Sequence, residues 1–166
     1  MRKRSVDTFF LFLETVGAAV WVGALVAFGF AVAGTLFRVL PSITLAGSVN
    51  AHMLHRLNLM EAVAAALMTI SALYFLVQPA ERTPIRLSKT VLLLLMGIAL
   101  FCYGMLITDR MEYLRTVEIG DFDHFDVAKQ AFRDEFNRLH TLYTRLVGAN
   151  LLLGLGFLLL STFERK

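Results

Sequence analysis

The chain has 166 residues, of which 57% are hydrophobic and 17% charged, and its formal net charge is +3. A soluble domain carries fewer apolar and more charged residues, so this composition indicates one membrane domain over residues 1–166, without a second globular unit. The basic residues flank the apolar runs instead of forming one stripe, which argues against nucleic acid as a partner. The single cysteine, Cys102, lies in an apolar run, so no intrachain disulfide can form.

Four apolar runs each reach the roughly 20 residues that a helix needs to cross a bilayer. They cover about residues 8–34, 55–77, 88–108 and 138–162. Pro41 ends the first run, a short linker follows over residues 42–50, and the two prolines within residues 78–84 indicate a turn. The sequence therefore predicts an all-α membrane protein, folded as a four-helix antiparallel transmembrane bundle.

An outer polar segment, residues 109–137, separates the third and fourth runs and carries the acidic residues Asp109, Glu112, Glu118, Asp121, Asp123, Asp126, Asp134 and Glu135. From Phe125 to Tyr143 its apolar residues recur at helical spacing, so helix four is expected to begin near Asp123 or Asp126, outside the bilayer, and to continue to about Thr162. The segment lacks the glycine turn and the terminal glutamate of an EF-hand loop. Helix capping explains these aspartates better than calcium binding does.

Lysine and arginine residues are distributed unequally between the two ends of the predicted bundle. One end carries Arg2, Lys3, Arg4, Arg82, Arg86, Lys89, Arg165 and Lys166, whereas the other carries the acidic segment. Because cytoplasmic loops are enriched in basic residues, both termini are expected in the cytoplasm, an N-in/C-in arrangement. This predicts a multi-pass protein of the bacterial cytoplasmic (inner) membrane, with the lipid bilayer as its partner.

In this topology the second and fourth helices both run inward, and both begin with polar residues. The motif His-Arg-Leu-Asn occupies residues 55–58, and its reverse, Asn-Arg-Leu-His, occupies residues 137–140. Residues at the outer ends of the other two helices lie at a similar depth. The sequence thus predicts an outer polar cluster, whose members are Arg38, His55, Asn58, Asp109, Asn137 and His140.

Several roles are open for this cluster. It fits an interfacial hydrogen-bond network, in which arginine and histidine side chains reach the headgroups. It also fits a metal site with the imidazoles of His55, His140 and His52 as ligands. Axial ligation of haem b by His55 and His140 is a third hypothesis, and passage of a substrate through the bundle is a fourth.

Two carboxylates, Glu14 and Glu61, lie deep within the predicted spans. Ionisable residues in a membrane are costly and often functional, so a proton or cation relay through both is one interpretation. The other is a neutral acid that hydrogen-bonds to a neighbouring helix through Thr15, Thr69 or Tyr103.

Small residues recur every fourth position in the first run, at Ala19, Gly23, Ala27 and Ala31. Such a ridge lets a second helix approach closely. The expected role is structural packing, within one bundle or between two.

Two stretches resemble a known family. Residues 17–23 (GAAVWVG), with residues 36–41 (LFRVLP), are similar to the first helix of the transmembrane protein 205-like family. Residues 136–140 (FNRLH), with the later Asn150, are similar to its last helix. This resemblance implies a four-helix membrane protein of poorly defined activity.

More distantly, the first helix resembles that of copper-resistance protein D and of the membrane-bound protoporphyrinogen oxidase. In those proteins a histidine seven residues before the W-x-G motif serves haem or metal. Here Glu14 occupies that position, seven residues before Trp21. The resemblance therefore supports the fold more than the metal chemistry, and it leaves His140 and His55 as ligand candidates.

No phosphate-binding glycine loop, nucleophile elbow or zinc-protease motif is present. The leading interpretation is a non-enzymatic inner-membrane protein that binds or handles a metal ion through the outer His/Asn cluster. The alternatives are a haem b-binding redox protein and a ligand-free structural or accessory subunit. The chain is expected to act as a homo-oligomer or as a subunit of a membrane complex.

Overall fold

The computed structural model describes residues 2–164, which form four long helical segments and contain no strand. Each segment is long and apolar enough to cross a membrane. The first comprises α1 (Arg2–Ala27), the π-helical stretch η1 (Phe28–Val32) and α2 (Ala33–Val39), and the second is α3 (Ile43–Leu76). The predicted all-α fold with four membrane-capable helices is confirmed.

The third and fourth segments are also compound. After the 3₁₀ turn η2 (Pro79–Glu81), the third segment comprises α4 (Pro84–Phe101), η3 (Cys102–Ile107), α5 (Thr108–Tyr113) and η4 (Leu114–Ile119). The fourth comprises the 3₁₀ turn η5 (Val127–Lys129) and α6 (Gln130–Glu164). The stretches η3 and η4 are π-helical, a distortion that often occurs near functional sites.

The expected linker at residues 42–50 is wrong, because α3 begins at Ile43. Leu40 is extended ahead of Pro41, as a residue before proline prefers, and this ends α2. The Ser42 hydroxyl then accepts a hydrogen bond from the backbone N–H of Leu45 at 3.0 Å and caps α3. His55, the predicted start of the second span, lies about three turns inside the helix.

The predicted start of the fourth helix is confirmed. Asp126 caps η5 by accepting a hydrogen bond from the backbone N–H of Ala128 at 2.9 Å. Helical structure then continues without a break to Glu164. The aspartate serves as a helix cap, as the sequence indicated.

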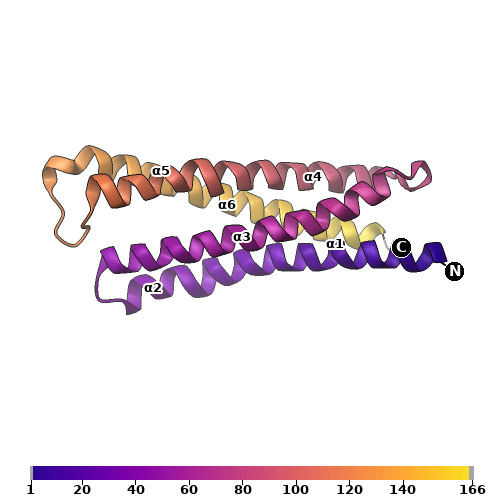
Figure 1. The fold of residues 1–166 in the computed structure, drawn as a ribbon, viewed down its shortest axis with the longest axis horizontal. Helices are drawn as coiled ribbons and strands as arrows, with labels where there is room; N and C mark the ends of the chain where they lie inside the picture. Colours follow the sequence, from indigo (N-terminus) through magenta and orange to yellow (C-terminus); the bar gives the residue numbers. More distant parts are fainter. Residues whose placement is uncertain (1, 165–166) are drawn as a thin grey trace.

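The four segments lie roughly antiparallel and form an elongated bundle (Figure 1). We call the end with both chain termini and the turn at residues 77–83 the terminal end. The distal end holds the turn at residues 40–42 and the loop at residues 120–126. The helices α1 and α3 pack against each other over much of their length, as do α4 and α6.

Tight packing occurs on a face of α1 other than the predicted ridge. Gly17 is buried, and a Cβ atom added there would lie 2.9 Å from the backbone oxygen of Ala64 on α3. Ala19, Gly23 and Ala27 are exposed, and a Cβ atom at Gly23 would meet nothing within 4 Å. Of the two roles expected for this ridge, packing within one bundle does not occur, and packing between two bundles stays a prediction.

Large side chains fill the centre of the bundle, and apolar side chains also cover much of its outside. Trp21, Met68 and Met96 are fully buried. Phe30, Leu94 and Leu152 are among many apolar residues that are more than 60% exposed. Such an exterior suits a lipid environment, because exposed apolar surface on this scale is rare in soluble monomers.

Candidate functional site

A pocket of about 270 Å³ opens between the two helical hairpins at the distal end. Helices α2, α3, α5 and α6 contribute to it, together with η4 and the loop at residues 120–126. Its apolar lining consists of Phe37, Ile43, Gly47, Ala51, Leu54, Met111, Phe122 and Phe136. Its polar lining consists of Thr44, Asn50, Thr108, Glu112, Arg115, Arg133, Asn137, His140 and Tyr143. We call this space the distal pocket.

The charges of the distal pocket are only partly neutralised. Arg115 donates two hydrogen bonds to Glu112, at 3.1 and 2.6 Å. Arg133 forms no salt bridge within residues 2–164, and its guanidinium carbon lies 4.5 Å from the centre of the Phe125 ring. Stacking on an aromatic face leaves a guanidinium able to bind an anion. Arg133 is thus a half-buried cation without a carboxylate partner at the edge of the pocket.

The loop at residues 120–126 closes one side of the pocket by binding the start of α3. Asp123 accepts hydrogen bonds from the backbone N–H groups of Ile43 and Thr44, at 2.8 and 3.1 Å, and from the Ser42 hydroxyl. Asp121 accepts a hydrogen bond from the Thr44 hydroxyl at 2.9 Å. The bond from Ser42 and the two backbone N–H groups hold the pKa of Asp123 well below its usual range.

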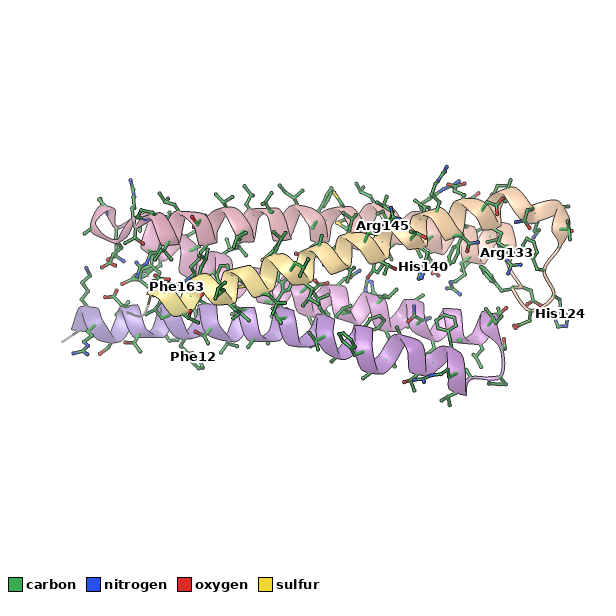
Figure 2. All side chains as sticks on the ribbon, turned by 180° about the vertical axis from the view of Figure 1, so that it is seen from behind. Phe12, His124, Arg133, His140, Arg145 and Phe163 are labelled. Atoms are coloured by element: carbon green, nitrogen blue, oxygen red, sulfur yellow. The ribbon has the colours of Figure 1, made fainter. Side chains whose placement is uncertain are left out.

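The same stabilisation of a charged carboxylate is seen at Asp121. Hydrogen bonds from the His124 side chain and from the backbone of Asp123 lower the pKa of Asp121 to about 2. His124 lies 3.0 Å from this carboxylate, on the exposed loop at the distal tip (Figure 2). The two aspartates therefore fasten the loop to α3 as anions.

Only part of the predicted outer cluster reaches the distal pocket. His140 and Asn137 line it, and Figure 2 shows His140 on the distal half of α6, between Arg133 and Arg145. His55 and Asp109 are exposed and do not line it. The cluster is therefore divided among several helix faces.

The remaining predicted cluster members make local or interhelical contacts. His52 is exposed, with its Nδ1 atom 2.9 Å from the Ser48 carbonyl oxygen of the same helix. Arg38 donates to the Gly34 carbonyl within its own helix at 3.1 Å. Asn58 donates across the bundle to the Gly104 carbonyl at 3.4 Å. Within residues 2–164 no group of three or more histidine, cysteine or carboxylate side chains is arranged to hold a metal ion.

A second polar cluster occupies the middle of the bundle, and we call it the central network. The Tyr103 hydroxyl donates to Oε1 of Glu61 at 2.5 Å, and Nδ2 of Asn150 donates to the Tyr103 oxygen at 2.8 Å. All three residues are fully buried. Tyr103 is one of the three hydrogen-bond partners predicted for Glu14 and Glu61, and it forms its hydrogen bond with Glu61.

Three oxygen atoms of this region have no hydrogen-bond partner: Oε2 of Glu61, Oδ1 of Asn150 and the hydroxyl of Tyr143. The Tyr143 ring packs edge-on against Tyr103, with 5.4 Å between the ring centres. Buried polar atoms are rarely left unpaired, so these three mark a place that needs a further partner. Because Tyr143 also lines the distal pocket, the central network adjoins the floor of that pocket.

A third cluster joins three helices at the terminal end. Lys89 donates to Glu14 and to Glu164, so that α1, α4 and α6 meet at one ammonium group. Arg86 also pairs with Glu164, and with Glu81 at 2.9 Å. Lys89 is 3% exposed. Glu14 is therefore one half of an ion pair, an arrangement that the sequence analysis did not foresee.

Apolar side chains separate the central network from the ion cluster. Leu93 and Met96 lie between Lys89 and Tyr103 in the third segment, and Phe157 lies between Asn150 and Glu164 on α6. All three apolar residues are buried. Glu14 and Glu61 thus belong to different clusters, and a direct relay between them has no support in this arrangement.

Comparison with known families bears on the first three helical segments. A model described as a domain of unknown function, DUF4149, matches residues 16–116, which is more than half of the chain. The chain belongs to the DUF4149 family. The DUF4149 match includes Glu61, Lys89 and Tyr103, whereas α6, with Arg133 and His140, lies beyond it.

No curated protein and no solved structure matches this DUF4149 chain significantly. The comparisons therefore bring no evidence for the transmembrane protein 205-like family or for copper-resistance protein D specifically. They also assign no activity.

Proposed function

We propose that this DUF4149 protein is a non-enzymatic, multi-pass protein of the bacterial inner membrane that binds a small amphiphilic anion in the distal pocket. The observation that carries this proposal is the unpaired Arg133 beside a pocket with aromatic walls. A guanidinium group recognises carboxylate or phosphate, and the phenylalanine rings of the pocket accept an apolar tail.

The spacing of charged residues supports a position of the pocket at the membrane surface. Lys89 and Asp109 are 20 residues apart in the third segment, and Arg145 and Glu164 are 19 apart in α6. At 1.5 Å per residue both intervals measure about 30 Å, the thickness of the hydrocarbon core. Arg133 lies beyond Arg145, toward the distal tip (Figure 2). The end of the pocket at Tyr143 would then lie near headgroup level, and Arg133 would lie about 18 Å beyond Arg145, on the outer side if both termini are cytoplasmic.

The test is binding of decyl phosphate to the protein purified in a mild nonionic detergent, measured by native mass spectrometry and by thermal stabilisation. Decyl trimethylammonium serves as the matched cationic probe. Decyl phosphate should bind and stabilise, and the cation should not. A charge-assisted hydrogen bond contributes about 1.5–3 kcal/mol, so Arg133→Gln should weaken binding roughly 10- to 100-fold.

The control variant is Arg138→Gln, because Arg138 is an exposed arginine of the same helix that does not line the pocket. Its affinity for decyl phosphate should equal that of the parent. Equal loss in both variants, or equal binding of the two probes, would overturn the proposal.

Metal handling remains a second candidate through His140, whose imidazole lines the pocket near Asn137. It needs ligands beyond those that the protein brings together, since His52 and His55 lie elsewhere. Elemental analysis and an absorption spectrum of the purified protein test it. A stoichiometric metal or haem that is lost in His140→Ala supports this candidate, and a colourless, metal-free protein removes it.

A further inference from the structure

We propose that Glu61 is the proton-binding group of an internal site, formed with Tyr103, Asn150 and Tyr143, that exchanges its proton with water through the distal pocket. The proposal does not depend on which ligand the pocket binds. It rests on the placement of these four polar side chains, on the absence, within residues 2–164, of a cation beside Glu61 and on the access to them from the pocket.

The first argument is the isolation of Glu61 from cations. Its side chain is fully buried, and it accepts a hydrogen bond from the Tyr103 hydroxyl. The cations nearest to Tyr103 along its segment are Lys89, 14 residues away, and Arg110, seven residues away. Arg56 on α3 and Arg145 on α6 are exposed. Lys89 is held by Glu14 and Glu164, and Arg110 by Glu135. An ionised carboxylate without a partner is costly at this depth, so a proton is the available neutralising partner.

The second argument concerns the groups that face Glu61 from the packed helices. On the third segment this group is Tyr103, and on α6 the groups are Asn150 and Tyr143; α1 contributes Trp21, which does not titrate. Oε2 of Glu61 is unpaired, as are Oδ1 of Asn150, the Tyr143 hydroxyl and the indole N–H of Trp21. A protonated Glu61 gains a donor for one of the oxygen acceptors, which an ionised one lacks.

The third argument is the asymmetry of access. Tyr143 is 6% exposed, lines the distal pocket and packs edge-on against Tyr103. On the opposite side the interior holds the buried apolar groups Met68, Met96 and Phe157, and beyond Met68 on α3 the buried hydroxyl of Ser71. A proton therefore has a polar route from the pocket past Tyr143 to Glu61, whereas mainly apolar side chains lie on the other side.

The test is infrared spectroscopy of the full chain in lipid nanodiscs, which reports the carbonyl stretch of protonated carboxylic acids. The parent should show an acid band near neutral pH that disappears in Glu61→Gln and persists in Glu14→Gln. The band should decrease reversibly when the pH is raised. Absence of a band that depends on Glu61, or a band that does not respond to pH, would overturn the proposal.

Access is tested by transferring the protein into D₂O and following the deuterium shift of the same band. Tyr143→Phe should keep the band and slow its exchange at least several-fold. Tyr113→Phe is the matched control, because Tyr113 is an exposed tyrosine that does not line the pocket, and it should exchange like the parent. Equal exchange rates in Tyr143→Phe and the parent would refute the route through the pocket.

One more variant, Tyr103→Phe, tests the proposal even if Glu61→Gln does not fold. Tyr103→Phe removes the hydrogen bond that Oε1 of Glu61 accepts. A carbonyl that loses a hydrogen bond vibrates at higher frequency, so the acid band should shift upward. An unshifted band would mean that the acid is not Glu61.

Discussion

The close approach of α1 and α3 at Gly17 makes a quantitative prediction about stability. In Gly17→Ala the added methyl carbon would lie 2.7 Å from Cγ of Met68 and 2.9 Å from the backbone oxygen of Ala64. Met68 has a flexible side chain and can move, whereas the carbonyl oxygen belongs to the α3 backbone. Ordinary contact begins at about 3.4 Å, so the two helices must separate by about half an ångström at this level.

The expected cost follows from two opposing contributions. Forcing an extra methyl group into a packed interior costs about 1–3 kcal/mol. Replacing glycine by alanine within a helix returns up to about 1 kcal/mol through helix propensity. Gly17→Ala should therefore lower the free energy of unfolding by about 1–2 kcal/mol.

The assay is reversible unfolding in mixed micelles with increasing sodium dodecyl sulfate, followed by the fluorescence of Trp21. This tryptophan is the single one in the chain and is fully buried one turn from Gly17. Gly23→Ala is the matched control, because its methyl group would meet nothing within 4 Å. It should leave stability unchanged or raise it by up to about 1 kcal/mol. A Gly17→Ala protein as stable as the Gly23→Ala protein would show that the reasoning about this contact is wrong.

Two further predictions concern the two ends of the bundle. Lys89→Met leaves Glu14 without its ion-pair partner and Glu164 with Arg86 alone. It should therefore cost about 3–5 kcal/mol in the same unfolding assay, and adding Glu14→Gln should restore part of the loss. A Lys89→Met protein with parental stability would contradict the ion cluster. At the distal end, the pKa of Asp123 is lowered in the folded protein. Its anchoring of the loop is therefore complete above the ordinary aspartate pKa of about 3.9. The anchoring weakens as the pH falls below that value toward the folded-state pKa. Asp123→Ala should therefore speed hydrogen exchange at the start of α3 near neutral pH. Asp134→Ala, on α6, is the control that should leave this exchange unchanged. Equal exchange in the two variants would refute the anchoring role.

Hydrophobicity, prolines and capping residues were sufficient to predict the four helices. The apolar runs predicted the number of membrane-capable helices, and Pro41 and Asp126 marked a helix end and a helix start. The start of α3 was missed because Ser42 was interpreted as part of a linker. The residue that stabilises this helix start, Asp123, lies about 80 positions away and could not be inferred from local sequence.

The sites were harder to predict than the helices, because they depend on helix rotation. Glu61 was singled out and Tyr103 was among its offered partners, since a buried carboxylate needs a hydrogen bond. The charge pattern places Lys89 among the flanking basic residues, although its position just inside the third span is a signal that it faces the interior. The sequence does not distinguish Arg133 from other basic residues, because neither its lack of a carboxylate partner nor its place at the pocket is visible there.

An experimental density map of the protein in nanodiscs with decyl phosphate would show whether the distal pocket binds an amphiphilic anion. We expect density for the phosphate at the Arg133 guanidinium and for the alkyl chain between Phe37 and Phe122, with neither feature present in Arg133→Gln. A pocket that stays empty at saturating decyl phosphate, or density that is the same in the variant, would contradict the proposed binding.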